Sequence, residues 1–439
     1  MPNARRADDE LPHPRQSDRK ILYLLIGYMW LFVHRPFEVW PILGTLPLER
    51  VYMLCVIAVW ALAQRKSWIE NPLNSAFGFF GAVVLVSAFL TPFSPGLDVA
   101  TQNWLKVAVF YVLLTTSVRN EAELRAVVLG YCAAVALYAG HSYREFLCGR
   151  HSYRMGIVRM VGVDATFNDP NAFAATLVYT LPLLGAAWSL TRRRWQRMAV
   201  GGSAALFAWC VFLTGSRAGF VGLLAAGLLQ LPRRGRLRVL LALLLLGTLA
   251  WNLSGEALQN RYLTLFDSSK GPETARQSAE GRKEGFFGGL AVFRRYPALG
   301  CGPGRFSETG VGFVQAHNLY GQVLGELGIA GVSAFVMLLA AFVRNNARAR
   351  SLARLSPDVQ LSPAYAINRA VMRSVALMLL LGLGGHNLYR YTWFWFGAFQ
   401  ALAVCALEKR ARQPFRSVGR GKTGADARDP GSRRSIPSA

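Results

Sequence analysis

The apolar residues of this chain are gathered in long blocks, and these blocks limit what the chain can fold into. One of them, VLLALLLLGTLAWNL, occupies residues 239–253. Blocks of about 15–22 apolar residues have the length of a helix that crosses a bilayer. The chain is 53% hydrophobic and only 17% charged, yet its net charge is +25, and soluble nucleic-acid-binding proteins reach such a charge with more polar chains. The sequence therefore predicts an all-α integral membrane protein and argues against nucleic-acid binding.

Twelve candidate spans can be placed along the chain. Basic segments such as TRRRWQR (191–197) and PRRGRLR (232–238) follow every second span, whereas the short connections PFSPGLD (92–98) and LTGS (213–216) hold no Lys or Arg. Because cytoplasmic loops are enriched in Lys and Arg, this alternation predicts that both termini are cytoplasmic. The predicted spans lie near residues 21–34, 51–64, 74–91, 103–117, 124–141, 170–190, 198–214, 217–232, 237–253, 317–343, 368–384 and 391–407.

The spans divide the chain into five parts. Residues 1–20 form a cytoplasmic tail without the apolar stretch of a removable signal peptide. Spans one to nine occupy 21–253, an outer loop with an amphipathic helix occupies 254–316, and spans ten to twelve occupy 317–407. Residues 408–439 are rich in Gly, Ser, Pro and Arg, which predicts a disordered basic tail beside the anionic phospholipid membrane surface.

Cysteine usage gives no sign of a metal centre. The chain has no CxxC pair and no Cys/His cluster, and we expect neither a metal nor a cofactor. Cys148 and Cys301 fall in outer segments and could form a disulfide, but their spacing leaves this open.

Two outer segments, 141–169 and 254–316, are rich in arginine, although short loops on that side carry no positive charge. An anionic ligand held there would explain this, because Arg pairs bidentately with phosphate oxygens. Alternatively, long loops escape the charge rule and these side chains are solvated. The arginines are Arg144, Arg150, Arg154, Arg159, Arg261, Arg276, Arg282, Arg294, Arg295 and Arg305.

Within TGSRAG (214–219), Arg217 stands where an outer connection enters a span. A charge at this depth is costly unless it is paired, reaches water or serves a ligand. Its neighbours are small, so a bulky anion could approach closely. The alternative is an arginine that only extends to the outer interface, and we favour the functional role.

Arg282 opens the segment GRKEGFFGGLAVFRR, in which apolar residues recur at helical spacing at Phe286, Phe287, Leu290 and Phe293. This pattern predicts the amphipathic helix on the outer face, and the backbone N–H groups at its start would favour anions. The following GCGPGRF turn (300–306) lacks the spacing of a nucleotide-binding P-loop.

The tetrapeptide HNLY occurs twice, at 317–320 and 386–389, in a chain with only six histidines. His317 lies where the long outer loop enters a span, and an imidazole there suits general-base chemistry, with Asn318 as an orienting group. Glu326 lies inside the span and needs a polar partner or a proton. Alone, an interfacial histidine is more often a structural hydrogen-bonding residue.

The second copy of HNLY has different neighbours. His386 and Arg390 precede the last span, within an aromatic run that resembles an interfacial belt: Tyr389, Tyr391, Trp393 and Trp395. Anchoring at the interface is therefore the favoured role here. We treat His386 as a secondary candidate near the same cavity as His317, and the repeat as coincidence.

Four of these pieces make the chain resemble a known family. They are TFNDPNAFA (166–174), TGSRAG, the Arg282 segment with YPALGCGPGRF (296–306), and AHNLYGQVLGELGIAGV (316–332). Together, in this order, they resemble the O-antigen ligase family, which also includes O-antigen polymerases and O-oligosaccharyltransferases. The resemblance extends over residues 160–345.

This resemblance implies an enzyme of the bacterial inner membrane with its active site in the periplasm. Members move a glycan from undecaprenyl diphosphate to an acceptor hydroxyl without a metal or nucleotide, and we expect the lipid A–core of lipopolysaccharide as the acceptor. By resemblance, Arg217 and Arg282 would hold the diphosphate and His317 would act as the base. We expect further substrate contacts from Arg154, Arg159, Asn171, Arg261, Arg305, Asn318, Glu326, His386 and Arg390.

Two departures from the family pattern concern the acceptor. The outer loop is short for an enzyme that holds lipid A–core, and GRKEGFFGG lacks a tryptophan expected shortly after the arginine. A protein hydroxyl or the growing glycan are therefore alternative acceptors. A transporter or flippase of lipid-linked sugar is an alternative of another class, but coupling would need charges inside the membrane, where Lys106 and Glu326 are the chief candidates.

Overall fold

The computed structural model describes residues 16–63, 66–93, 99–154, 157–164, 169–230, 255–264, 273–311 and 316–412, with scattered helical residues between 237 and 252. Within these ranges the chain is almost entirely helical, and its strands form one short antiparallel hairpin. The long helices are α1 (Gln16–His34), α4 (Leu48–Leu62), α5 (Pro72–Phe89), α6 (Val99–Ser117), α7 (Glu121–Leu147), α8 (Pro170–Leu190), α9 (Arg194–Leu213), α10 (Arg217–Gln230), α14 (Leu319–Leu355), α16 (Pro363–Gly382) and α17 (Tyr391–Arg412). The remaining elements are α2 (Pro36–Val39), α3 (Pro41–Gly44), β1 (Ser152–Arg154), β2 (Ile157–Arg159), α12 (Glu256–Leu263), α13 (Glu273–Arg295), η2 (Phe306–Thr309) and α15 (Pro357–Gln360).

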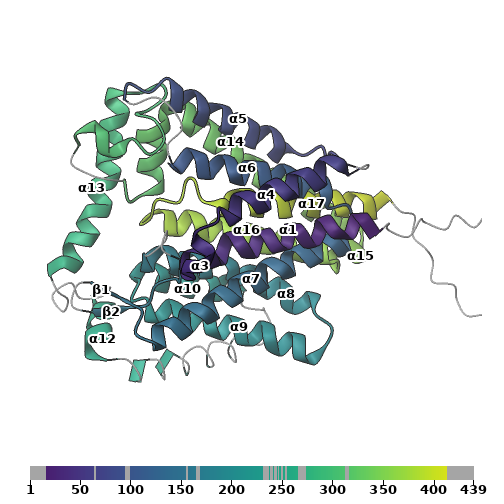
Figure 1. The fold of residues 1–439 in the computed structure, drawn as a ribbon, viewed down its shortest axis with the longest axis horizontal. Helices are drawn as coiled ribbons and strands as arrows, with labels where there is room; N and C mark the ends of the chain where they lie inside the picture. Colours follow the sequence, from purple (N-terminus) through teal and green to yellow (C-terminus); the bar gives the residue numbers. More distant parts are fainter. Residues whose placement is uncertain are drawn as a thin grey trace, which may run out of the picture.

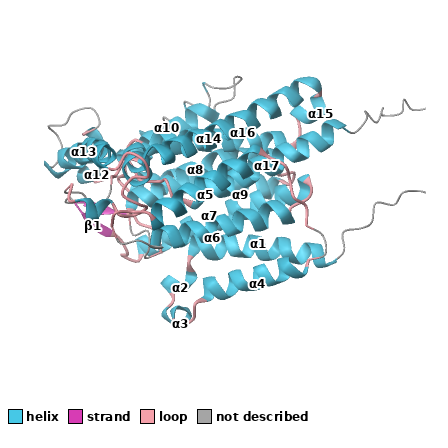
Figure 2. Ribbon diagram, turned by 90° about the horizontal axis from the view of Figure 1, so that it is seen from above, coloured by secondary structure: helices cyan, strands magenta, loops and turns pink. Residues whose placement is uncertain are grey.

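The long helices run side by side and form one bundle (Figure 1, Figure 2). One end of the bundle, which we call the loop end, carries the β1–β2 hairpin, α12 and α13. At the opposite end, the termini end, α1 begins and α17 ends. The elements that carry the predicted site residues lie at the loop end or reach it. The side chains of Arg282 and Arg154 are outside the described part of the chain.

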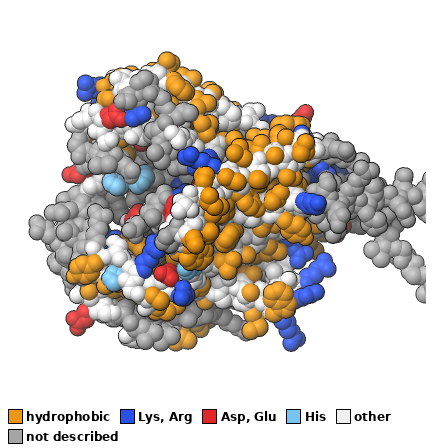
Figure 3. All heavy atoms as spheres, in the orientation of Figure 1, with side chains coloured by type: hydrophobic (Ala, Val, Ile, Leu, Met, Phe, Trp, Pro, Cys, Tyr) orange, Lys and Arg blue, Asp and Glu red, His pale blue; other side chains and the backbone are white. Residues whose placement is uncertain are grey.

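Eleven of the twelve predicted spans overlap one of the long helices, and most of the predicted span 237–253 lies outside the described residues. Among the described residues, six helices are long and apolar enough to cross a membrane: α5, α7, α8, α9, α14 and α16. Figure 3 shows hydrophobic side chains across the middle of one face of the bundle. The chain is therefore a helical protein with several candidate membrane spans, while the full number of twelve stays a prediction.

Several helices extend beyond the predicted spans by one to a few turns. α1 begins at Gln16, inside the predicted tail, and α17 continues to Arg412, beyond the predicted end at 407. The extra turn of α17 is basic, which favours a helix C-terminus, and Arg410 pairs with Glu121 at 2.9 Å. α14 starts at Leu319 and continues to Leu355, well beyond 343.

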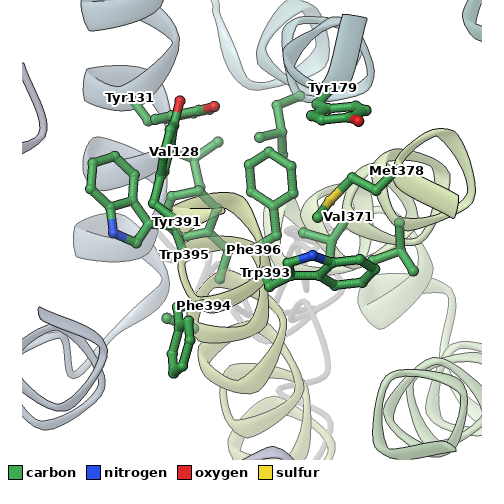
Figure 4. Packing of buried hydrophobic residues seen from close by; sticks show 14 of the residues in the cluster. Val128, Tyr131, Tyr179, Val371, Met378, Tyr391, Trp393, Phe394, Trp395 and Phe396 are labelled. Carbon is green, nitrogen blue, oxygen red and sulfur yellow. The ribbon is translucent and has the colours of Figure 1, made fainter. Parts of the chain in front are cut away.

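The last helix, α17, lies at the centre of the bundle and packs against α16, α6, α14 and α7. The aromatic residues predicted to form an interfacial belt are in fact core residues: Trp393 is 2% exposed and Trp395 is fully buried (Figure 4). The Trp393 indole donates a 2.9 Å hydrogen bond to the Asn387 carbonyl. The belt prediction failed because the pattern of aromatic residues does not reveal whether neighbouring helices enclose them.

α14 is broken at Gly328, whose φ of 60° and ψ of −154° are not helical. The backbone groups freed there bond to the segment after α13: Ile329 N–H donates to the Pro297 carbonyl at 2.8 Å, and Cys301 N–H donates to the Gly325 carbonyl at 2.9 Å. Irregular backbone at membrane depth is tolerated where protein satisfies its polar groups. The predicted GCGPGRF turn is therefore docked into the break of α14.

α13 is the amphipathic helix expected in the outer loop, and its predicted apolar residues are only partly buried: Phe286, Leu290 and Phe293 are half-buried. Phe287 is 63% exposed, whereas the buried side of the helix carries Gly285 and Gly289. A methyl group added at Gly285 would overlap the Ala316 carbonyl, and one at Gly289 would overlap the backbone of Gly321. The two helices thus approach closely because glycine leaves room for the backbone.

Candidate active site

The two HNLY segments, 69 positions apart in the chain, meet at the loop end. The rings of His317 and His386 lie 5.5 Å apart, edge to face, with an angle of 65° between their planes. Asn318 caps α14 by accepting hydrogen bonds from the backbone of Tyr320, at 2.9 Å, and Gly321, at 3.1 Å. Its amide donates to the Leu383 carbonyl at 2.9 Å, which ties the start of α14 to the loop that carries His386.

His317 has an unusual backbone conformation. Its φ is 45°, and among the described non-glycine residues only His317 and Arg35 have a positive φ. Holding a residue there costs about 1–3 kcal/mol and persists only where the surroundings impose it. Here the preceding residue, Ala316, is buried and packs against Gly285 of α13, while the His317 side chain itself is exposed. The strained backbone therefore presents the imidazole to solvent.

His386 differs from His317 in its electrostatic setting. By surface area its side chain is exposed, like that of His317, but the neighbouring protein still desolvates the ring. This desolvation, with the neighbouring positive potential of His317 and Arg390, lowers the pKa of His386 to about 4, and Asp169 opposes the shift. His386 is thus neutral at pH 7, so a proton bound by His317 would not be repelled by a second positively charged imidazole.

The first turn of α8 contacts Arg390, which follows His386 by four positions. Arg390 donates a hydrogen bond to the Ala172 carbonyl at 3.1 Å and reaches Thr176 Oγ1 at 3.4 Å. Asp169 caps the same helix by accepting from the backbone of Asn171 and Ala172, at 3.1 and 3.2 Å. The TFNDPNAFA motif therefore places a capped helix start beside the loop of His386.

Asn171 joins the other side of this helix start to the TGSRAG turn. Its Oδ1 accepts hydrogen bonds from Ser216 Oγ at 2.8 Å and from Arg159 Nη2 at 3.2 Å. The sequence motif containing Asn171 and the motif containing Ser216 are thus in direct contact, although 45 positions separate these residues.

Three buried arginines surround the TGSRAG turn. Arg159 is 2% exposed, Arg261 is 5% exposed and Arg217 is 9% exposed. Arg159 Nε donates to the Thr214 carbonyl at 2.8 Å, Arg261 Nε donates to the Gly215 carbonyl at 2.6 Å, and Arg217 Nη1 donates to Thr264 Oγ1 at 3.2 Å. Three guanidinium groups at one turn make a strongly positive region of the kind that binds phosphate. We call this group the arginine cluster.

Two other predicted ligand residues have local partners. Glu326 is 2% exposed, and its carboxylate accepts from Gly304 N–H at 3.1 Å and from the Gln322 amide at 3.3 Å. It thus holds the GCGPGRF turn onto α14 instead of lining the surface of the site. Arg305 pairs with Glu308 of η2 at 2.8 Å.

The side chains of Arg282 and Arg154 lie outside the described residues. The Arg282 backbone belongs to α13 and stands one turn before Gly285, which packs against the residue that precedes His317. Arg154 belongs to β1, where it pairs with Ile157 of β2. The helix that carries Arg282 is therefore fixed beside the histidine pair, and Arg154 is placed only by its strand.

Sequence reasoning missed two features that build this site. Gln322 links Glu326 to the His386 loop, because its Oε1 accepts from Leu388 N–H at 3.3 Å. The glycines of α13 and α14 were also overlooked, although the pairs Gly285–Gly289 and Gly321–Gly325 both have the four-residue spacing that signals close helix packing.

Among the described residues, no group of three or more His, Cys, Asp and Glu side chains could hold a metal ion. Cys148 is exposed, Cys301 is buried, and both are free thiols. The arrangement offers an imidazole pair that can take up a proton, a capped helix start, and a cluster of guanidinium groups that can stabilise negative charge.

Residues 202–336 match the profile of the protein family described as O-antigen ligase. This stretch contains Arg217, Arg261, Arg282 and His317, whereas His386 lies beyond it. A comparison with curated proteins finds no match to the chain. This match supports the resemblance to the O-antigen ligase family for three of the four sequence motifs, since TFNDPNAFA (166–174) lies outside residues 202–336. Members of this family are membrane glycosyltransferase-like enzymes.

Proposed function

We propose that this protein is an O-antigen ligase that transfers a glycan from undecaprenyl diphosphate to an acceptor hydroxyl, with lipid A–core of lipopolysaccharide as the acceptor. The observation that supports this proposal is that the start of α8 contacts the arginine cluster through Asn171 and also contacts Arg390, which follows His386 of the histidine pair by four positions. A glycosyl transfer needs both kinds of group, and α8 brings them together.

The arginine cluster suits the leaving group of this reaction. When the bond between the sugar C1 and the phosphate oxygen breaks, negative charge develops on the diphosphate. Preorganised donors that meet developing charge lower the barrier, by about 3–4 kcal/mol for a single donor in well-studied sites. In this proposal Arg217, joined by Arg159, Arg261 and the Arg282 of α13, holds the diphosphate.

His317 suits the acceptor side. The acceptor oxygen forms the new bond to C1, the electron pair of the C1–O bond leaves with the diphosphate, and the acceptor proton passes to the His317 ring. His386 stays neutral beside it, so the pair takes up a single proton. A positioned general base contributes about 10²–10⁴-fold to such a step.

The proposed setting is the bacterial inner membrane with the site in the periplasm. The site lies at the loop end, opposite the termini end, where both chain ends are predicted to be cytoplasmic. No metal, nucleotide or nucleic acid takes part in the proposed reaction.

A reconstitution experiment tests the proposal. Proteoliposomes receive an undecaprenyl-diphosphate-linked glycan, with or without lipid A–core, and donor consumption and glycosylated product are measured. We expect consumption only with acceptor present, and its loss in His317→Ala, Arg217→Ala and Arg282→Ala variants that insert normally. Full transfer by the His317→Ala protein would overturn the mechanism.

The same experiment separates the alternatives. Product formed on a protein hydroxyl, or glycan chains that lengthen without lipid A–core, would assign the protein to the oligosaccharyltransferase or polymerase activities of the family. Movement of donor across the vesicle without any transfer would indicate a transporter. Substitutions of Arg390 and Asn171, which contact the start of α8, are a second set of variants for each of these measurements.

A further inference from the structure

Two charges inside a predicted span, Arg369 and Arg373, have no explanation in the proposed site. Lys106 pairs with Glu49 at 3.4 Å, and Glu326 is held by Gly304 and Gln322. Arg373 of α16, by contrast, forms no hydrogen bond or ion pair with any residue that the structure describes. α16 is itself one of the six helices long and apolar enough to cross a membrane.

Arg373 lies deep in this helix. At the termini end, the Glu121 carboxylate accepts from Ala364 N–H at 2.8 Å and pairs with Arg410 at 2.9 Å, which marks the polar edge of the bundle there. Nine positions separate Ala364 from Arg373, which corresponds to about 13 Å along a helix axis. Arg369 lies only five positions from Ala364, so the long arginine side chains of this part of α16 can extend toward the headgroup region at the termini end.

The Arg373 side chain is on the outer side of the bundle. It is partly exposed and shares its face of α16 with the exposed residues Arg369 and Ala376, one turn to either side. The opposite face is buried against α8, where Ser374 donates to the Tyr179 carbonyl at 2.8 Å. Arg369 and Arg373 therefore form a basic stripe that faces away from the core; Arg369 also lies 5.9 Å from the Tyr365 ring.

Within the part of the chain that the structure describes, no acidic side chain pairs with Arg369 or Arg373. Two arginines one turn apart repel each other, and a charged residue at this depth on a bilayer-facing surface is costly without a partner. The predicted ninth span, 237–253, contains no Asp or Glu, so it supplies no carboxylate at this depth. An anion from outside the protein would supply the negative charge that the described residues do not.

We propose that Arg369 and Arg373 bind the phosphate of an anionic phospholipid drawn in beside α16. Two guanidinium groups one turn apart match the oxygens of a phosphodiester, and Arg reaches phosphate bidentately. The partly exposed Met372 and Leu379 of the same helix give an apolar surface for the acyl chains. The stripe lies toward the termini end, far along α16 from the arginine cluster, which favours a membrane phospholipid over the diphosphate donor.

The test measures bound lipid and does not depend on transferase activity. The full chain is reconstituted in nanodiscs of phosphatidylcholine with a minor fraction of phosphatidylglycerol, then analysed by native mass spectrometry after extraction. We expect the wild type to retain phosphatidylglycerol and the Arg369→Gln/Arg373→Gln variant to lose it by about tenfold or more, because hydrogen bonds between charged groups are worth that much.

A matched control is available on α14. Arg350 and Arg354 have the same spacing and are exposed near the termini end, so Arg350→Gln/Arg354→Gln should retain the lipid. Arg369→Lys/Arg373→Lys keeps the charge and should bind at an intermediate level, which guards against a folding defect in the Gln variant.

Equal phosphatidylglycerol retention by wild type and the Gln variant would overturn the proposal. Loss of phosphatidylcholine to the same extent would also do so, as would arginine-dependent binding of undecaprenyl phosphate in place of phosphatidylglycerol in nanodiscs that contain both lipids.

Discussion

The loop end of the bundle holds two pairs of histidines, and they are built differently. His34 and His141 share a 2.8 Å hydrogen bond between ring nitrogens, and their rings stack 5.0 Å apart. Trp30 stacks on His34, and Trp40 stacks on His141. His317 and His386 meet edge to face, without indoles above and below them, and His317 is exposed.

The difference shows what makes a histidine available for catalysis. His34 is only 4% exposed and is enclosed by aromatic rings, and its one hydrogen-bonded neighbour is another imidazole. That pair joins α1 to α7 and behaves as a packing contact. The His317 pair lies beside arginines and a helix start, with a side open to an acceptor. Access and neighbours, rather than residue type, distinguish the two pairs.

The largest expected effect separates the two pairs directly. His317→Gln should reduce glycan transfer by about 10²-fold or more, the usual contribution of a general base. His141→Gln should leave transfer within about threefold and lower the thermal unfolding midpoint, because it removes one buried hydrogen bond. Transfer rates and unfolding midpoints of both purified variants test this. The comparison fails if the two substitutions reduce transfer equally.

A smaller effect is expected from the contact that places α13. Gly285→Ala should force α13 away from Ala316 and displace Arg282 and His317 relative to each other, with a loss of about 10- to 100-fold in transfer, as misplacement of about 1 Å can produce. Gly281→Ala, one turn earlier on the same helix, meets no atom within 4 Å and serves as the control. Equal activity of both variants would show that α13 can shift without consequence.

A modest, pH-dependent effect is expected at His386. His386→Asn should reduce transfer about three- to tenfold at pH 7, the range expected for loss of one aromatic contact worth about 0.5–1.5 kcal/mol. The pKa of His386 is about 4 in the fold, below its unfolded value of 6.5. The unfolded chain therefore binds more protons between pH 6.5 and 4, and stability is complete above pH 6.5 and falls across that window. Unfolding midpoints from pH 7.5 to 4.5 should fall less steeply in the variant than in the wild type.

Much of this fold could be predicted from the sequence, because helix formation in a membrane depends on local composition. The blocks of apolar residues placed eleven of the long helices, and the position of Arg217 at the start of a helix followed from the turn before it. The motifs also placed His317 and Asn318 at the entry to α14, where Asn318 caps the helix. Each of these features rests on residues close together in the chain.

Other features could not be predicted, because they depend on contacts between distant segments. Trp393 and Trp395 have the composition of an interfacial belt but lie in the core, since four helices enclose α17. The sequence suggests that Glu326 is a functional acid inside a span. In the structure its carboxylate accepts hydrogen bonds from the Gly304 N–H and the Gln322 amide. A local pattern does not reveal which side of a helix other helices will cover.

The two HNLY segments show where this division lies. The sequence by itself determined that each histidine stands at a junction between loop and helix, because apolar runs and polar breaks are local properties. The sequence placed His386 near the same cavity as His317, but only the tertiary structure decided that their rings lie 5.5 Å apart and that His34 and His141 form a hydrogen bond with each other. Packing of α13, α14 and α16 brings the first pair together, and such packing depends on the complementary shapes of distant residues.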